Sequence, residues 1–384
     1  MSVKLIYEQN NQNCRLATLN NDELTEVEFY DESRAHEGNI YLGRIVKKIE
    51  LANGKTGYFL DIGDSRDAFI NGEEPELEDL MAAEGQSVVV QICQEQRAEK
   101  GAKLTRALQF VGENLVYCPY RMDIEASCKI EDKLRVENLV SLVEENMTGQ
   151  EGWIIRTSAA DAADKVVVDE MAMLRKKFDD VLDKTKQVKS PALLMERNNC
   201  LEDAFLRNRK HLEGIVLNNH NLEEKYKDKT EVTYCTNPFK EFGIDEAIDD
   251  ALQKEVRLKN GGRITIEETR ACTAIDVDSG DDNGKGSLGR LNIEAAFEIA
   301  KQIRLRNLSG KIIVDFAGTS DYKYLKNAID ILEQELRKDY IKSTVFGLSR
   351  GGNVEIVRVR RRPTLRNIMT EECPTCRGTG SVEK

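Results

Sequence analysis

The fold is decided by two neighbouring stretches, TAIDVDSG (residues 273–280) and NIEAAFEIAKQIRLRNLSGKIIVDF (residues 292–316). In the second stretch the apolar residues first recur at helical spacing and then give way to the strand-like run KIIVDF. Asn292 is expected to cap the start of the helix and Gly310 to end it. The two stretches together therefore predict a strand–helix–strand unit whose strands are parallel and joined by a crossover.

Three aspartates lie where these strands end. Asp276 and Asp278 are two residues apart, so their side chains project from the same face of a strand, and Asp315 ends the second strand. Open α/β sheets bind ligands beyond the carboxyl ends of their strands, and crowded carboxylates are commonly neutralised by a divalent cation. A Mg²⁺ site for phosphate chemistry is therefore predicted, the alternative being solvent-exposed aspartates that simply close two strands.

Composition limits the classes of function. The chain has 384 residues, enough for two to four domains, and a net charge of −12, so any RNA binding must rely on local cationic clusters. Candidates are Arg304 with Arg306 and the run of arginines at 358 and 360–362, although each would equally suit a solvated face. Three histidines in no recognisable constellation argue against histidine acid–base chemistry. Nine scattered cysteines and no apolar run of membrane-spanning length favour a reduced, cytoplasmic protein.

The first hundred residues predict strands and a small β-barrel. Runs such as KLIYEQ, CRLATLN and LTEVEFY alternate as strands do, and residues 38–72 contain short strands broken by Gly and Asn. Phe59 and Phe69 on these strands, with Arg97 and Lys100 downstream, suit single-stranded RNA, because rings stack on bases and cations bind phosphates. The alternative, aromatic rings of the barrel core beside solvated cations, stays open.

Two further motifs are candidates for binding. Arg156 and Thr157 follow a short apolar strand and precede a long charged helical stretch, which together could form a phosphate pocket. Near the end of the chain, Cys373 and Cys376 form a CxxC pair followed by RGTG. Zinc needs four ligands, so we expect a second copy of the chain to supply the other pair, against the alternatives of a redox or inert pair.

Taken together, these features resemble the bacterial RNase E/G family of endoribonucleases. The segments that carry the resemblance occur in the family's order and cover nearly the whole chain: GNIYLGRIVKKI, GYFLDIG with AFI, EKGAKLT, GWIIRTSA, QKEVRLKNGG, TAIDVDSG, NIEAAFEIAKQIRLRNLSGKIIVDF and CPTCRGTG. The match is to a short, RNase G-like form without the small C-terminal domain that longer relatives carry, which leaves the stability of an oligomer in question.

The resemblance implies an α/β multidomain architecture. It comprises an RNase H-like domain split by insertions (1–35 and 202–250), an inserted OB-fold RNA-binding barrel (36–106) and a sensor of the RNA 5′ end (107–201). A DNase I-like α/β catalytic domain (251–370) and a CxxC zinc-link (371–384) follow. The implied function is Mg²⁺-dependent cleavage of single-stranded RNA in rRNA processing and mRNA decay, with a preference for 5′-monophosphorylated RNA and with 5′-phosphate products.

The resemblance also assigns roles to individual residues. Asp276 and Asp315 match the magnesium ligands, and Asp278 would be catalytic where the family usually has Asn. Phe59, Phe69 and Lys100 match RNA contacts of the barrel. The remaining assignments are a 5′-phosphate site formed by Arg156, Thr157 and Lys129, and a Zn²⁺ link formed by Cys373 and Cys376. The zinc-link would join two protomers, with a higher oligomer as the alternative.

Departures from the family pattern keep other functions open. Asp278 adds a negative charge, Cys128 replaces a basic residue beside Lys129, and Arg270 stands where an acidic residue is common. One alternative is therefore an RNA-binding factor of the same fold that cleaves weakly or not at all. A third possibility is a scaffold protein whose main role is the zinc-linked dimer.

Overall fold

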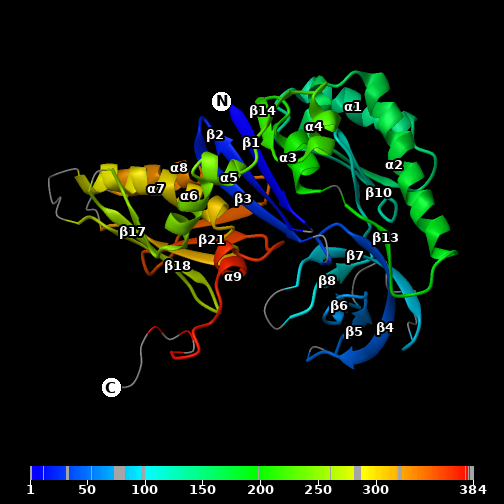
Figure 1. Ribbon diagram of the computed structural model, residues 1–384, viewed down its shortest axis with the longest axis horizontal. Coiled ribbons are helices and arrows are strands. Elements are labelled where there is room, and N and C mark those ends of the chain that lie inside the picture. Colours follow the sequence, from blue (N-terminus) through cyan, green and yellow to red (C-terminus); the bar gives the residue numbers. More distant parts are fainter. Residues whose placement is uncertain are drawn as a thin grey trace. The chain divides into compact units, whose positions relative to one another are not determined.

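The computed structural model describes residues 2–11, 13–31, 34–52, 54–72, 83–96, 100–197, 199–259, 261–280, 287–318, 322–376, 378 and 380. The chain divides into two compact units, which are drawn in sequence colours in Figure 1. The first unit combines residues 1–33 with 199–384, and the second consists of residues 34–198. Each unit contains two β-sheets and is described by itself.

The first sheet of the first unit has the strand order β15-β14-β1-β2-β3. Its strands are β1 (Val3–Asn10), β2 (Asn13–Asn20), β3 (Glu23–Asp31), β14 (Leu212–Leu217) and β15 (Glu231–Tyr234). β1, β2 and β3 form an antiparallel meander, whereas β14 lies parallel to both β1 and β15. The three strands expected in the first thirty residues are confirmed.

Helices cover both faces of this sheet. They are α3 (Cys200–Asn208), α4 (His220–Tyr226), α5 (Pro238–Glu241) and α6 (Ile244–Leu252). Leu5 packs with Phe205 of α3 and Tyr226 of α4, whereas its neighbour Ile6 packs on the other face with Phe239 of α5 and Ile248 of α6. The run KLIYEQ is apolar on both sides because the strand is buried on both faces.

The second sheet of this unit has the order β16-β17-β18-β19-β21-β20. Its strands are β16 (Glu255–Arg257), β17 (Arg263–Glu268), β18 (Thr273–Asp278), β19 (Gly310–Asp315), β20 (Ser343–Leu348) and β21 (Val354–Arg358). β18 and β19 are parallel neighbours, and the other pairings of the sheet are antiparallel. The helix between them, α7 (Ser287–Leu305), makes the predicted parallel crossover.

α7 and α8 (Tyr322–Arg337) lie together along one face of this sheet (Figure 1). Their side chains share a core with alternate strand residues, including Ile275, Val277 and Val314. The strand residues between these, Asp276 and Asp315 among them, therefore project from the opposite face. A last short helix, α9 (Leu365–Met369), is capped by the hydroxyl of Thr364, which accepts a hydrogen bond from the Asn367 amide.

Both ends of α7 differ from the prediction. Asn292 lies inside the helix and is buried, where its Nδ2 donates to the Ala317 carbonyl at 2.9 Å, so it ties down the segment after β19 instead of capping. The helix ends at Leu305 and not at Gly310. Asn307 has a left-handed φ of 49°, and the Leu308 amide donates to the Ile303 carbonyl at 2.9 Å, the pattern of a Schellman termination.

The second unit contains a small closed barrel, as the sequence predicts. Its sheet has the order β13-β4-β5-β6-β8-β7, and pairing of β4 with β7 closes a ring of five strands, as in an OB-like barrel. The strands are β4 (Ile40–Glu50), β5 (Thr56–Asp61), β6 (Ala68–Asn71), β7 (Ser87–Gln94), β8 (Lys103–Thr105) and β13 (Ala192–Met195). Inward-facing aliphatic residues such as Leu60, Val90 and Leu104 fill the barrel.

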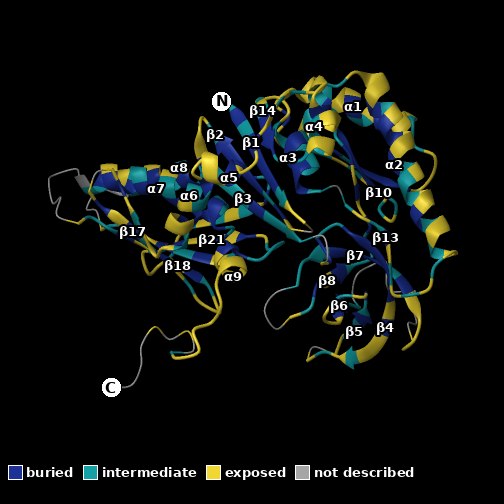
Figure 2. Cartoon of the chain, viewed as in Figure 1, coloured by how far each residue is buried: buried dark blue, intermediate teal, exposed yellow. Residues whose placement is uncertain are grey.

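The second sheet of this unit has the order β11-β12-β10-β9. Its strands are β9 (Phe110–Val111), β10 (Leu115–Cys118), β11 (Ile124–Ala126) and β12 (Gly152–Ile155). The helices are α1 (Lys133–Glu145), the 3₁₀ turn η2 (Thr157–Asp161) and α2 (Asp164–Thr185), whose buried side includes Val167, Met171 and Leu174 (Figure 2). Within the described part of the chain, every helix is too short or too polar to cross a lipid bilayer.

A buried ionic cluster joins the two sheets of the first unit. Glu28 of β3 accepts a hydrogen bond from Arg207 at 2.7 Å and also pairs with Arg362, which contacts the Tyr340 hydroxyl. The Arg207 guanidinium lies 4.1 Å from the centre of the Tyr340 ring. Burial alone would raise the pKa of Glu28, but the charges of Arg362 and Arg207 outweigh it and lower this pKa to about 2.

Replacing Glu28 should therefore destabilise the first unit in a pH-dependent way. At pH 7 we expect Glu28→Gln to lower the free energy of unfolding by about 3 kcal/mol, because two arginines lose a buried carboxylate. The folded-state pKa lies below the ordinary value of 4.5, so the stabilisation is complete above that pH and declines as the pH falls toward 2. Urea unfolding at pH 7 and pH 3 measures the difference.

Glu231→Gln is the matched control, since Glu231 is an exposed residue of the same sheet. It should change stability by less than about 0.5 kcal/mol at either pH. A Glu28→Gln penalty of equal size at pH 7 and pH 3 would contradict the assigned coupling.

Candidate functional site

The parallel pairing of β18 and β19 sets Asp276 directly opposite Asp315. Each aspartate lies at or near the C-terminal end of its strand, at the carboxyl edge of the sheet, and both side chains are exposed. Opposed residues on neighbouring strands have Cβ atoms about 5 Å apart, so the two carboxylates face one another across a distance that one cation can bridge. This is the edge at which open α/β sheets bind their ligands.

The electrostatics of Asp276 reflect this crowding. Partial burial raises the pKa of Asp276, and the negative charges of Asp315 and Asp278 raise it further, whereas Arg263 opposes them. Two facing carboxylates that disfavour each other's ionised form are stabilised by a bound cation. In proteins Mg²⁺ is usually bound by one or two carboxylates, and water and substrate phosphate complete its coordination shell.

Asp278 is engaged differently from the other two acids. One of its oxygens accepts a hydrogen bond from Arg263 at 2.7 Å and the other accepts from the Gly280 amide at 2.9 Å. These two donors lower the pKa of Asp278, the Gly280 amide most strongly. Across the described residues, no three His, Cys, Asp or Glu side chains gather closely enough to hold a metal ion. The pair that could receive a cation is therefore Asp276 with Asp315.

A second candidate surface lies on the barrel. Phe59 and Phe69 are opposed on β5 and β6 with ring centres 5.5 Å apart, and both are only half-buried. Gly57 leaves room for the Phe69 ring, because a Cβ at that position would lie 2.7 Å from it. The rings are thus not part of the barrel core but form a platform on its outside.

Cations flank this platform. Lys47 is opposed to Phe59 on β4, and Lys103 is opposed to Phe69 on β8. Together with Lys100, which is exposed, they line a groove of about 740 Å³ that also contains both rings. Arg97, the fourth predicted RNA-binding residue, lies outside the described residues.

Sequence reasoning missed Lys47 and Lys103. They lie apart from each other along the chain, and only the pairing of four neighbouring strands puts them at the two ends of one aromatic row. The sequence did contain one signal, the alternation of polar and apolar residues. Lys103 is exposed and its neighbour Leu104 is buried, so predicting a strand here would have placed the Lys103 side chain on the outside of the barrel.

The predicted 5′-phosphate residues converge at one edge of the second unit. β11 and β12 are parallel, so the segment 127–129 and the segment 156–157 leave the sheet side by side. The hydroxyls of Ser127 and Thr157 are 2.9 Å apart, and the Lys129 amide donates to the Ser127 hydroxyl at 3.3 Å. The side chains of Thr157 and Lys129 are exposed.

Arg156 is held at this edge by its own contacts. Its guanidinium donates to the backbone carbonyls of Gly112 and Glu113. Ser158, two residues on, donates to the same Glu113 carbonyl at 2.5 Å. The loop before β10 thus fixes both residues beside Thr157, and a cation with two hydroxyls is a suitable environment for a phosphate group.

The cysteine pair lies in a turn after α9. Cys373 is exposed and Cys376 is half-buried. Backbone amides of Cys376 and Thr375 donate to the Cys373 sulfur and lower the pKa of its thiol. A thiolate-favouring CxxC turn is compatible with metal ligation, but it supplies two of the four ligands that zinc takes.

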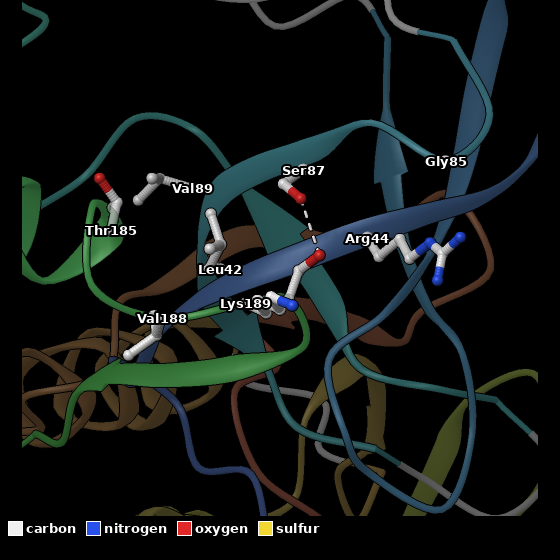
Figure 3. Close-up of a pocket in the computed structure, with 9 residues that line it drawn as sticks. Leu42, Arg44, Gly85, Ser87, Val89, Thr185, Val188 and Lys189 are labelled. Carbon is white, nitrogen blue, oxygen red and sulfur yellow. Dashed lines mark hydrogen bonds between the residues drawn. The ribbon is translucent and has the colours of Figure 1, made fainter.

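A separate cavity of about 610 Å³ lies in the second unit between the outside of the barrel and the chain that follows α2 (Figure 3). Arg44 and Ser87, opposed on β4 and β7, line it together with Lys189, and the hydroxyls of Ser87 and Ser190 are 2.7 Å apart. The predicted site residues do not line this cavity.

One arginine in each of the two predicted basic clusters is buried and has a structural role. Arg358 is buried, where it donates to Asp339 at 2.8 Å and to the Leu308 carbonyl at 3.0 Å. Arg306 is also buried and donates to Gln302 and to the Gln253 carbonyl. The prediction that these two arginines attract RNA was wrong, because their charges are used to join elements within the first unit.

Comparison with known proteins agrees with the resemblance noted in the sequence. The family model described as the ribonuclease E/G family matches residues 109–361. Ribonuclease G of Escherichia coli strain K12 is 30% identical over 418 aligned positions, which cover 100% of this chain and 85% of the relative. Ribonuclease G of Haemophilus influenzae is also 30% identical, with 84% of the relative covered. Ribonuclease E of Escherichia coli K12 is 28% identical, and the match covers 39% of that protein.

Proposed function

The chain belongs to the ribonuclease E/G family, and we propose that it is a Mg²⁺-dependent endoribonuclease that cleaves single-stranded RNA. The observation that carries the proposal is the opposition of Asp276 and Asp315 at the ends of two parallel strands. In a ribonuclease family, a pair of carboxylates suited to Mg²⁺ is best explained as the site of phosphodiester hydrolysis. By the family resemblance, its products carry 5′-phosphate and 3′-hydroxyl groups.

The site residues have three proposed roles: binding the cation, orienting water and binding RNA. Asp276 and Asp315 would hold the cation, which, when bound, supplies Lewis acidity toward a phosphodiester and toward water. Asp278, fixed by Arg263, lies two residues from Asp276 and would orient water beside the cation. On the barrel, Phe59 and Phe69 would stack on bases, while Lys47, Lys100 and Lys103 would hold the RNA backbone.

The proposal includes a preference for RNA with a 5′-monophosphate. Arg156 and Thr157, with Lys129 on the adjacent segment, form the edge that would bind this group. The exposed Cys128 adds no charge there, so the grip should be weaker than that of a pocket with a second cation.

We assign the domains as the family resemblance implies. The split RNase H-like domain is 1–35 with 202–250, the OB-fold domain is 36–106, the 5′-sensor is 107–201, the DNase I-like domain is 251–370 and the zinc-link is 371–384. The closed five-stranded barrel and the parallel crossover support the second and fourth assignments. Zn²⁺ bound by Cys373 and Cys376 of two copies would link a cytoplasmic homodimer that acts in rRNA processing and mRNA decay.

The ion pair between Asp278 and Arg263 favours a second candidate function. It occupies both oxygens of Asp278 together with the Gly280 amide, which could leave water poorly oriented. The protein would then bind RNA through the barrel but cleave it weakly or not at all.

Cleavage of an A/U-rich, 5′-end-labelled single-stranded RNA tests the main proposal. We expect cutting in Mg²⁺ that stops in EDTA, and a loss of at least about 100-fold in kcat/KM for Asp276→Asn or Asp315→Asn, because each removes a ligand of the cation. Asp330→Asn, on the exposed side of α8, is the control and should leave the rate unchanged. RNA binding without cutting at high protein concentration would favour the second candidate.

A pair of otherwise identical RNAs tests the 5′-phosphate site. Monophosphorylated RNA should be cut faster than triphosphorylated RNA, and in Arg156→Ala or Thr157→Val the two rates should become similar because the phosphate loses its donors. RNA with a 5′-hydroxyl serves as the reference substrate. Equal cutting of the mono- and triphosphorylated forms by the unaltered protein would refute the sensing role.

Metal analysis combined with mass measurement tests the zinc-link. We expect one zinc per two chains, and in Cys373→Ser both the zinc and the dimer should be lost, because only two ligands remain. Cys128→Ser, which removes an exposed thiol elsewhere, should retain both. A dimer free of zinc would defeat this part of the proposal.

A further inference from the structure

We propose that the β20–β21 hairpin holds the RNA next to the Asp276–Asp315 pair, with Arg350 binding a phosphate and Phe346 stacking on a base. The inference rests on the proposed ribonuclease function, and it assigns two residues that neither the motifs nor the family resemblance singled out. Both residues lie in the first unit, and the sheet that carries them also carries the two aspartates.

The strand register brings the hairpin loop to the edge of the sheet where the aspartates lie. β21 is antiparallel to β19, and the pairing ends with Val314 opposite Val354, one residue before Asp315. The loop that precedes Val354, residues 349–353, therefore extends past the end of β19 on the same edge as Asp315. Arg350 is part of this loop.

The loop is well defined by its own hydrogen bonds. The Ser349 amide donates to the Asn353 carbonyl at 2.8 Å, and the Gly352 amide donates back to the Ser349 carbonyl at 3.1 Å. Gly352 has a φ of 91°, a left-handed conformation that favours glycine. Arg350 is exposed at the tip of this closed turn. A cation on a fixed turn loses little conformational freedom when it binds a phosphate.

Phe346 is the most exposed aromatic side chain in the described part of the chain, at 66%. The register between β20 and β21 shifts between Val345 and Gly347, so Phe346 is the extra residue of a β-bulge. Gly347 has a φ of 82°. Bulges re-aim side chains and are common beside active sites.

Burial gives the face on which Phe346 lies. Val345 is opposite the buried Ile356 and packs against the core under α7 and α8. Phe346, which the bulge removes from strict alternation, is 66% exposed and so lies away from that core, on the open face of the sheet that carries Asp276 and Asp315. Gly347 is opposite Glu355, and Glu355 is opposite Ile313, two residues before Asp315. The bulge is therefore two strand spacings and two residues from Asp315, a distance of about 12 Å, which a few nucleotides can span.

The charges of this face suit a nucleic acid strand whose bases and phosphates contact different residues. The acids Asp276, Asp315 and Glu355 would repel phosphates unless a cation intervenes, whereas a neutral base can lie over Phe346 next to Glu355. Arg350 then supplies positive charge at the loop, beyond the end of β21. The alternative is that a second copy of this chain covers the Phe346 ring, but such a contact would not require Arg350 at the tip of the loop.

The experiment compares Phe346→Ala, Arg350→Ala and Arg350→Lys in the full chain. With a single-stranded RNA we expect each alanine variant to raise KM with kcat nearly unchanged, because the contacts hold substrate and transition state alike. Loss of one stacked base should weaken binding about 5- to 150-fold, and Arg350→Lys should restore part of the loss. Arg350→Ala should also reduce the salt dependence of binding by about one ion.

Matched controls come from the same sheet. Arg270→Ala removes an exposed arginine in the β17–β18 turn, at the opposite end of the strands, and Phe297→Ala removes an exposed ring of α7 on the helix side. Neither should change KM. Equal KM values for the controls and the hairpin variants would overturn the inference.

Binding is measured in parallel in Mg²⁺ with Asp276→Asn as the background, so that a cation is available to the acidic face while cleavage is suppressed. If that protein binds RNA and the hairpin variants weaken binding, the inference holds even where cleavage is absent and the proposed nuclease function has failed. If RNA is cut or bound but the hairpin variants bind it normally, only the hairpin assignment fails. Should Phe346→Ala change the mass of the assembly and leave RNA binding intact, a second copy covers the ring and the inference is overturned.

Discussion

The parallel pairing of β18 with β19 is the constraint on which the candidate chemistry depends. It opposes Asp276 and Asp315 and so creates a repulsion that Arg263, which is hydrogen-bonded to Asp278, offsets only in part. The crossover through α7 makes this pairing possible, because parallel neighbours cannot be joined by a tight turn. The helix also fills one face of the sheet, which turns both acids to the other face.

The distribution of charge explains how an acidic chain can act on another acidic polymer. The net charge is −12, so attraction has to be local. On the barrel, Lys47 and Lys103 lie at the two ends of the aromatic pair. In the second sheet of the first unit, the exposed Arg350 lies at the tip of the β20–β21 loop. The lysines lie beside the rings that we propose to stack on bases, and the arginine lies on the same edge as the aspartates that we propose to bind a cation.

Other arginines serve the fold instead. Arg358 with Asp339, and Arg207 and Arg362 with Glu28, are pairs in which burial strengthens the interaction and makes loss of one partner costly. They join elements distant in sequence within the first unit. Runs of basic residues in a sequence therefore do not by themselves indicate a nucleic-acid surface, because single members such as Arg358 can be buried in ion pairs.

The sequence by itself determined the strands of the first thirty residues, the barrel, the crossover and the place of Asp276 and Asp315 at strand ends. These follow from local periodicity and from the geometry of parallel connections, which involve residues close along the chain. Tertiary structure alone decided that Asp278 meets Arg263, that Lys47 and Lys103 bracket Phe59 and Phe69, and that Asn292 is a buried tie rather than a cap. Those outcomes depend on strand register and on contacts between side chains of different elements, and register, unlike periodicity, is set by the packing of the whole sheet.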